Sequence, residues 1–395
     1  MIEINSISRI AIRQLAAALF LAAISSLVVS ATEPGVHVVV GERGTEPPGR
    51  HVTRDLSGVL TTGENLTLKL NTDLGSLRIV PLQPGATPVV RYSVHLETDA
   101  RGEAAAQLLD RYAFNAKSTP AGAEITGNLP QLSRGNGGAQ FWVHYEIAVP
   151  ASYSLDVTTG AGDIQTFDVG GTATLVTEGG NIVGGRIGTN FIRGQKARGR
   201  GNLTRLVGKL QTQGGHIQVD DVAGDLTAFT AGGHINTGRI FGEANLQSGG
   251  GHIRSAAIDG RAELATEGGN ITVGKAEKLV TVKTGGGQID FGEVRGSVRA
   301  QTGGGGIRVM YVAGPMDVES SGGSICLTRV SGSVRAATDS GTITAWINPE
   351  AERHSETVNL PGASQLTSGE GDIVVFLPKN LAANIEAIVE NGGAR

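Results

Sequence analysis

An isoleucine recurs every eighteen residues through the second half of the chain. Around each one, apolar and polar residues alternate with a period of two, which is the pattern of a β-strand with one buried face. A second alternating run follows in each unit, with apolar pairs such as Leu226/Ala228 and Val280/Val282. Each unit is therefore predicted to contain two strands. The recurring positions are Ile217, Ile235, Ile253, Ile271, Ile289, Ile307, Ile325 and Ile343.

Glycine and hydroxyl residues separate these strands. A Gly-Gly pair stands before nearly every isoleucine, and a second glycine site lies seven residues after it, from Gly224 to Gly332 with Lys278 as the exception. Both sites are predicted to be turns, where either a positive φ or a close approach of two backbones requires glycine. A further column, which precedes the Gly-Gly pair, always holds a hydroxyl residue: Thr230, Ser248, Thr266, Thr284, Thr302, Ser320 and Thr338.

A unit of this kind cannot bury its apolar face alone, so it must stack on the next unit. The predicted fold is all-β: a parallel β-solenoid (β-helix) with 18-residue rungs about 4.8 Å apart. A calcium β-roll fits worse, because its recurrent Asp is missing. A left-handed hexapeptide coil also fits worse, because an aliphatic residue does not recur every six positions.

The pattern extends toward the N-terminus with an interruption. Residues 155–164 and 68–79 fit the same columns, with Leu77 in the isoleucine column. We expect residues 59–150 to form a mixed N-terminal capping segment that contains the first rung and one short helix, at Gly102–Phe114. Residues 32–58 are expected to be a loose leader, and residues 151–395 the Gly-rich solenoid repeat.

Three later segments depart from the repeat. Residues 183–211 break the register, and residues 348–362 insert before a rung at Ile373. The chain ends at "NIEAIVENGGAR", where a new Gly-Gly turn begins, so we expect the repeat to be incomplete at its C-terminus. The alternating run Asn384–Glu390 is then expected to be an open edge through which the solenoid self-associates.

The N-terminal segment indicates export. Residues 1–31 read as a signal peptide, with Arg9 and Arg13 before the apolar run Leu15–Val29 and cleavage expected after Ala31. The alternative is an uncleaved anchor helix; after cleavage, no transmembrane span is expected. The expected location is periplasm, outer cell surface or secreted. A formal charge of −4 argues against nucleic-acid binding.

The repeated T-x-G-G-x-I-x-V units resemble the bacterial putative-adhesin family of β-strand-repeat proteins, and so does "HYEIAVPASYSLDVTTGAGDI" at residues 144–164. This domain of unknown function is related to the putative auto-transporter adhesin, head GIN domain. The resemblance covers residues 60–395. It implies an envelope or surface protein with an adhesive role, and it supplies no catalytic residues.

Candidate chemistry is sparse. His216, His234 and His252 occupy the column before the isoleucine, where they form either a structural ladder, which we favour, or a metal site. The same column continues with Asn270 and Gln288, which favours the ladder. The acids Asp220, Asp221, Asp225 and Asp290 lack the cleft that paired-carboxylate hydrolysis needs. Cys326 is interpreted as a bystander thiol. No catalytic, metal or cofactor residues are therefore predicted.

A basic cluster is the one local anomaly. It is interpreted either as a solvated insert or as a contact for an anionic ligand, and it comprises Arg193, Lys196, Arg198, Arg200, Arg205 and Lys209.

The predicted function is an exported, non-enzymatic envelope or cell-surface β-solenoid, an adhesin or structural binding protein. Its partner would be an envelope glycan or a surface protein. One alternative is a bactofilin-like scaffold that polymerises end to end. The other is a polysaccharide-active β-helix enzyme.

Overall fold

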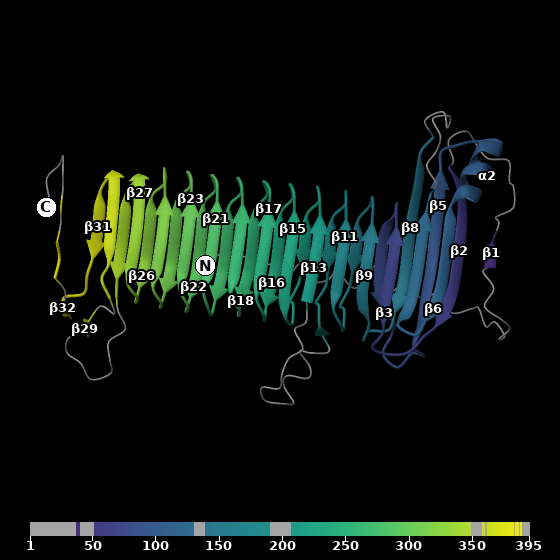
Figure 1. Cartoon of the computed structure of the whole chain (residues 1–395), viewed down its shortest axis with the longest axis horizontal. Helices are drawn as coiled ribbons and strands as arrows, with labels where there is room; N and C mark the ends of the chain where they lie inside the picture. Colours follow the sequence, from purple (N-terminus) through teal and green to yellow (C-terminus); the bar gives the residue numbers. More distant parts are fainter. Residues whose placement is uncertain are drawn as a thin grey trace, which may run out of the picture. The chain divides into compact units, whose positions relative to one another are not determined.

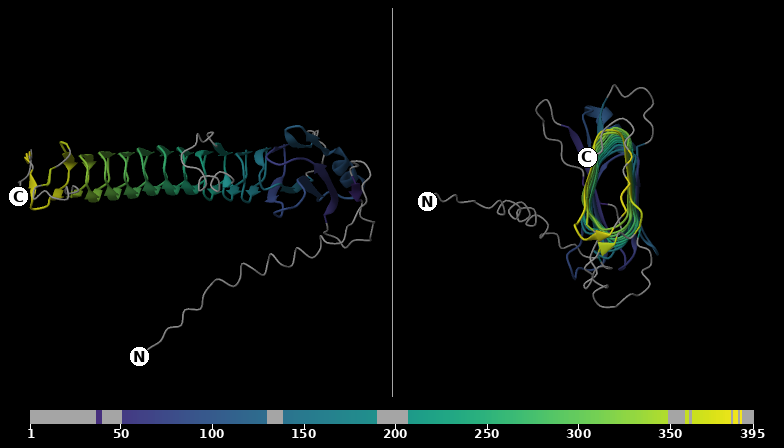
Figure 2. Two further views of the ribbon diagram at one scale, coloured as in Figure 1. Left: turned by 90° about the horizontal axis from the view of Figure 1, so that it is seen from below. Right: turned by 90° about the vertical axis from the view of Figure 1, so that its left-hand side faces the viewer.

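The computed structural model describes residues 37–39, 51–129, 139–189, 207–348, 358–359, 362–382, 384–386 and 388. All of them belong to one compact unit, Val36–Arg395. Two long sheets face each other across a single core in this unit, and each turn of the chain contributes one strand to each sheet (Figure 1). Seen end-on, each turn is a flattened loop (Figure 2). The predicted all-β parallel solenoid is confirmed.

The first sheet, here sheet A, has sixteen strands. In spatial order they are β1 (His37–Val39), β2 (Val52–Thr61), β5 (Val89–Thr98), β8 (Phe141–Val149), β4 (Ser76–Pro81), β10 (Ile164–Thr166), β12 (Ile182–Gly184), β14 (Ile217–Val219), β16 (Ile235–Ile240), β18 (Ile253–Ile258), β20 (Ile271–Ala276), β22 (Ile289–Val294), β24 (Ile307–Val312), β26 (Ile325–Val330), β28 (Ile343–Ile347) and β31 (Ile373–Phe376).

The second sheet, here sheet B, has fourteen strands. In spatial order they are β30 (Gln365–Glu370), β27 (Val334–Ser340), β25 (Met316–Ser320), β23 (Val298–Thr302), β21 (Val280–Thr284), β19 (Ala262–Thr266), β17 (Ala244–Ser248), β15 (Asp225–Thr230), β13 (Val207–Thr212), β11 (Ala173–Thr177), β9 (Ser154–Thr159), β3 (Thr67–Thr72), β7 (Gly122–Asn128) and β6 (Ala113–Thr119). A small third sheet pairs β29 (Val358–Asn359) with β32 (Leu381–Ala382).

The isoleucine column is an in-register ladder through sheet A. Ile164 pairs with Leu77 on one side and with Ile182 on the other, and the ladder continues to Ile343 and Ile373. From Leu77 to Ile343 every member is at most 2% exposed. Full burial of such a side chain contributes roughly 1.5–3 kcal/mol, so the stacked column is a main source of stability.

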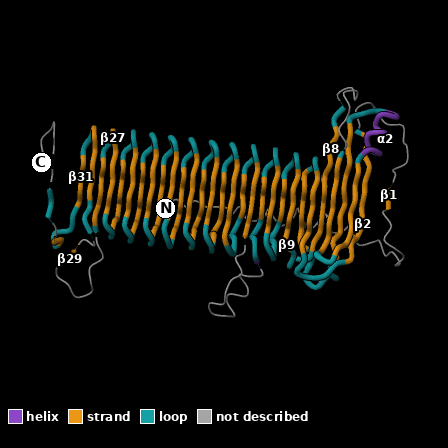
Figure 3. Tube along the Cα trace, in the orientation of Figure 1, coloured by secondary structure: helices purple, strands orange, loops and turns teal. Residues whose placement is uncertain are grey.

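The first rung is covered by a cap built from antiparallel strands. The chain leaves β4, forms β5, the helix α2 (Gly102–Arg111), β6, β7 and β8, and returns to the solenoid at β9. β8 lies parallel to β4, but β5 and β2 continue sheet A in antiparallel pairing. Figure 3 shows the helix at the cap end of the stack. Its buried residues are Ala105, Leu108 and Leu109. The first strands of the solenoid therefore pair with cap strands, which do not follow the 18-residue repeat.

Two boundaries differ from the sequence predictions. The helix ends at Arg111 rather than Phe114, because Ala113 begins β6 and pairs with β7. β2 begins at Val52, inside the segment expected to be a loose leader, because its alternation buries Leu56 and Leu60 against the cap core.

The predicted break at residues 183–211 is narrower in the structure. β12 pairs in register with β14, and β11 pairs in register with β13. An isolated bridge also joins Ile187 to Val222. The ladder is therefore continuous on both sides of residues 190–206, which lie outside the described part.

At the β31 end of sheet A, the residues that continue the buried columns are exposed. Ile373 occupies the isoleucine column but is 42% exposed, and Val375, which pairs with the buried Ala345, is 38% exposed. The strand expected at Asn384–Glu390 is not found in its described residues, Asn384–Glu386 and Ile388. Within the described ranges, β31 is therefore the last strand of sheet A.

Candidate ligand-binding groove

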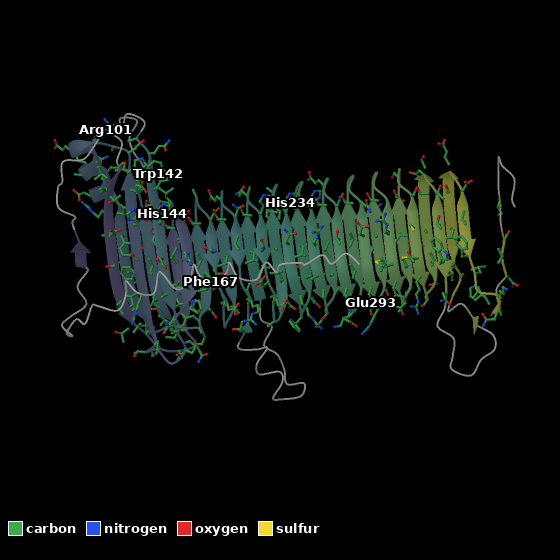
Figure 4. All side chains as sticks on the ribbon, turned by 180° about the vertical axis from the view of Figure 1, so that it is seen from behind. Arg101, Trp142, His144, Phe167, His234 and Glu293 are labelled. Carbon is green, nitrogen blue, oxygen red and sulfur yellow. The ribbon has the colours of Figure 1, made fainter. Side chains whose placement is uncertain are left out.

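The three repeated histidines form a stacked ladder. The rings of His216 and His234 lie 4.8 Å apart with an interplanar angle of 9°, and those of His234 and His252 lie 4.9 Å apart at 6°. Figure 4 labels His234 within the solenoid. The backbone N–H of His234 donates to Nδ1 of His216 at 2.9 Å, and that of His252 donates to Nδ1 of His234 at 2.8 Å. Each imidazole therefore accepts the turn amide of the next rung.

This geometry fixes the protonation of the rings. A ring whose Nδ1 accepts a hydrogen bond carries its proton on Nε2 in the neutral form, which leaves no free lone pair for a metal ion. Burial, followed by the neighbouring His216 and His252, lowers the pKa of His234, which favours that neutral form. The geometry therefore supports the structural ladder over the metal site.

Other side chains in the same column also accept the backbone N–H of the next rung. Asp163 accepts the backbone N–H of Asn181 through Oδ1, Asn181 accepts that of His216, and His252 accepts that of Asn270. Side chains with an acceptor of suitable reach are thus interchangeable at these positions, which accounts for the Asp, Asn and His residues of the column.

The hydroxyl column satisfies the other side of the turn. Thr230 donates to the carbonyl oxygen of Gly215 in the preceding rung and accepts the backbone N–H of Gly233 in its own turn. Hydroxyls in neighbouring rungs repeat the donated bond, each to the glycine fifteen residues earlier. Buried donors and acceptors are costly when unpaired, so this column requires Ser or Thr.

The two glycines of each pair have different reasons to be glycine. A Cβ at Gly233 would overlap the carbonyl oxygen of Gly215, whereas a Cβ at Gly232 would meet nothing within 4 Å. Neither residue has a φ in the left-handed range. Of the two reasons offered by the sequence, close backbone approach therefore accounts for the second glycine.

A groove of about 1050 Å³ follows the outer side of sheet B beside these turns. Its lining includes Gly249, Gly285 and Gly303, which have no side chain to fill the space. One wall is a column of outward residues that face one another in register across consecutive strands. From β15 to β25 this column reads Phe229, Gln247, Ala265, Lys283, Gln301 and Glu319.

The groove offers mixed polar and aromatic contacts. Phe229 is 40% exposed, so its ring face is accessible. Nε2 of Gln301 donates to Glu319 at 3.4 Å, and Nε2 of Gln247 donates to Asn245 at 3.0 Å. The lining contains one lysine and two glutamates, Lys283, Glu267 and Glu319, a formal charge of −1. This balance does not favour a polyanionic ligand.

Three of the four acids noted in the sequence have structural partners. Oδ1 of Asp221 accepts the backbone N–H of Arg239, and Oδ1 of Asp225 accepts that of Glu243, both at 2.8 Å. Asp290 accepts Nε2 of Gln288 and lies 3.6 Å from Arg308. These carboxylates therefore brace turns and neighbouring rungs.

Of the basic cluster, only Lys209 belongs to the described residues. It is exposed on β13 and stands opposite Thr227 on the outer side of sheet B. Arg193, Lys196, Arg198, Arg200 and Arg205 lie outside the described part, so the anionic contact stays a prediction. Cys326 is a half-buried free thiol.

The groove column was not singled out from the sequence. Its residues are the outward position directly before each hydroxyl, so the repeat itself marks the column. The groove itself could not be predicted from the sequence, because it forms only where several stacked rungs bring this column and the neighbouring turns together on one surface.

The signal peptide expected at residues 1–31 also lies outside the described part. Among the described residues, every helix is too short or too polar to cross a membrane.

Comparisons with known proteins give distant similarities. No protein-family model matches the chain, and no curated protein matches it. A solved structure of a "putative adhesin" from Bacteroides fragilis NCTC 9343 is 13% identical, covers 67% of this chain and 100% of its own, and has a TM-score of 0.28. A "putative cell adhesion protein" from Clostridium sporogenes ATCC 15579 is 9% identical, covers 83% of this chain and 100% of its own, and has a TM-score of 0.19.

A third similar structure is a "putative lipid binding protein" from Parabacteroides distasonis ATCC 8503, which is 11% identical, covers 84% of this chain and 98% of its own, and has a TM-score of 0.22. Two of the three descriptions name adhesion. Similarity at these TM-scores does not bear on function, and membership of the adhesin family stays a prediction.

Proposed function

We propose that the protein is an exported, non-enzymatic ligand-binding β-solenoid of the cell envelope or cell surface, with an adhesive or structural role. The observation that carries this proposal is the groove that follows consecutive strands of sheet B from Phe229 to Glu319. A groove aligned with the stacking direction suits a ligand that is itself extended.

The lining favours an uncharged, polyhydroxylated polymer, that is, a glycan. Amide side chains at Gln247 and Gln301 both donate and accept hydrogen bonds, as hydroxyl-rich ligands require. Phe229 offers an apolar ring face at one end of the groove. Because the lining has a formal charge of −1, an acidic polysaccharide would be disfavoured there.

The spacing of the acids in the groove supports binding without cleavage. Glu267 directly follows β19 and Glu319 lies in β25; both line the groove, but the two strands are three steps apart in sheet B. At about 4.8 Å per step this is roughly 14 Å along the stack. Glycoside hydrolysis uses two carboxyl groups about 5–9.5 Å apart. The spacing therefore supports a binding protein over a polysaccharide-cleaving enzyme.

The structure of the cap supports the end-to-end polymerising scaffold less well than it supports a binding protein. Head-to-tail polymerisation requires each end of the stack to continue the parallel ladder of the next molecule. At the cap end, β5 pairs antiparallel with both β2 and β8 in sheet A, and β6 pairs antiparallel with β7 in sheet B. These strands do not present the repeating register of the solenoid.

A matched pair of variants tests the groove. Ala265→Trp would place a large side chain in the middle of the groove wall, whereas Ala257→Trp makes the same change on sheet A. Binding to immobilised neutral and acidic polysaccharides would be measured for both. We expect neutral-glycan binding that Ala265→Trp abolishes and Ala257→Trp retains. Equal binding by both variants, or shortening of the polysaccharide during incubation, would contradict the proposal.

The location is tested separately. Protease shaving of intact cells should release fragments of this chain if it lies on the outer surface. Protection in intact cells, followed by digestion after the outer membrane is opened, would place it in the periplasm.

A further inference from the structure

The outer face of the cap carries a second group of histidines. On the antiparallel strands β2, β5 and β8, Asp55, His95 and His144 stand directly opposite one another in one cross-strand row. Directly paired residues have Cβ atoms about 4.5–5.5 Å apart, so their side chains can meet a common ligand. The His95 and His144 rings lie 6.4 Å apart between centroids, with an interplanar angle of 27°.

Asp55 orients the first of these rings. Its Oδ1 atom lies 2.6 Å from Nδ1 of His95. A carboxylate at this distance holds the proton on Nδ1, so the lone pair of Nε2 points away from the aspartate. The same carboxylate–histidine arrangement orients metal-binding histidines in proteins. It is the opposite of the solenoid ladder, where Nδ1 of His234 accepts and Nε2 carries the proton.

The face is accessible and rich in carboxylates. His144 is exposed, and the side chain of His95 is 41% exposed. Glu97 stands two residues from His95 and contacts Nδ1 of His51, whose ring stacks on Trp142 at 5.0 Å. Figure 4 labels Trp142 and His144, two residues apart on β8. Nearby negative charge favours a bound cation.

We propose that His95 and His144 form a surface site for a divalent transition metal ion of the zinc, copper or nickel class, with Nε2 of each ring as ligand. Imidazole nitrogen suits these ions at about 2.0–2.1 Å for zinc. Among the residues that the structure describes, no three His, Cys, Asp or Glu side chains are grouped to hold one ion. The site therefore has two protein ligands, water completes the coordination, and the expected affinity is micromolar rather than nanomolar.

Zinc chloride and the chain purified without a histidine tag provide the test. Isothermal titration should give one zinc ion per chain. His95→Gln and His144→Gln should each abolish saturable binding, and Asp55→Asn should weaken it about 10–100-fold. His234→Asn is the matched control and should bind zinc as the unchanged chain does, because the ladder has no free lone pair.

Nitrogen NMR of the unchanged chain gives a reading that does not depend on folded variants. On zinc addition, the Nε2 resonances of His95 and His144 should shift, while those of His216, His234 and His252 should not. Absence of saturable binding, binding that survives His144→Gln in a folded protein, or shifts confined to the ladder would overturn the proposal.

Discussion

The backbone N–H of His252 donates a 2.8 Å hydrogen bond to Nδ1 of His234, one rung earlier in the solenoid. The side chain of one rung thus satisfies the turn amide of the next, and the ring stacking follows from the strand spacing. A residue at this position needs an acceptor at the right reach more than it needs an imidazole.

Asparagine should therefore replace His234 without loss of stability, since Asn270 fills the same role two rungs later and accepts the N–H of Gln288. His234→Leu removes the acceptor and should cost about 1 kcal/mol. Urea unfolding compares the two variants directly. Equal stability of His234→Leu and the unchanged chain would show that water replaces the acceptor without cost.

The ladder should also make stability depend on pH. Folding lowers the pKa of His234 from its ordinary value of 6.5. At pH values between these two pKa values, the unfolded chain therefore binds more protons at this residue than the folded chain does. The stabilising contribution is present above about pH 6.5 and is lost as pH falls through the folded pKa. We expect the melting temperature to fall between pH 7.5 and 5, and to fall less in His234→Asn. Parallel pH profiles for the two proteins would contradict this role.

The two glycines of one turn should respond differently to alanine. Gly233→Ala places a methyl group against the carbonyl oxygen of Gly215, and separating the rungs should cost about 2 kcal/mol or more. Gly232→Ala enters open space and should change stability by less than about 1 kcal/mol. Denaturant midpoints measure both. A larger loss in Gly232→Ala than in Gly233→Ala would mean that the turn has a different backbone arrangement.

The exposed strand β31 should promote self-association. Ile373 and Val375 occupy positions whose partners Ile343 and Ala345 are fully buried. Antiparallel pairing of β31 with β31 of a second copy would cover both residues and form a closed dimer. Sedimentation at rising concentration should show this dimer, and Ile373→Asp should abolish it while leaving the fold stable.

Ile271→Asp is the control for that experiment. It lies in the same column but is fully buried, so an unpaired charge there should cost roughly 4–5 kcal/mol. A chain that stays monomeric up to about 100 μM, well above a micromolar Kd, would show that β31 is protected. Similar stability losses for Ile271→Asp and Ile373→Asp would contradict the register.

The repeat could be predicted from sequence because each rung repeats the same local pattern. The spacing of Ile217, Ile235 and Ile253 fixed strand, turn and stacking together, and placed Leu77 correctly across the cap. The role of Thr230 could not be predicted, since its hydroxyl joins two turns from different rungs. The metal site proposed on the cap could not be predicted either, because His95 and His144 meet only through the long-range pairing of β5 with β8.

The most direct test of the ligand-binding account is affinity as a function of glycan length. Phe229 and Glu319 are five strand steps apart in sheet B, or about 24 Å along the groove. Titration with neutral oligosaccharides of increasing length should give affinity that rises until the ligand spans about this distance and then levels off. Phe229→Ala should weaken the long ligands. Affinity that is already maximal for a single sugar, or that is unchanged by Phe229→Ala at every length, would contradict a ligand lying along the groove.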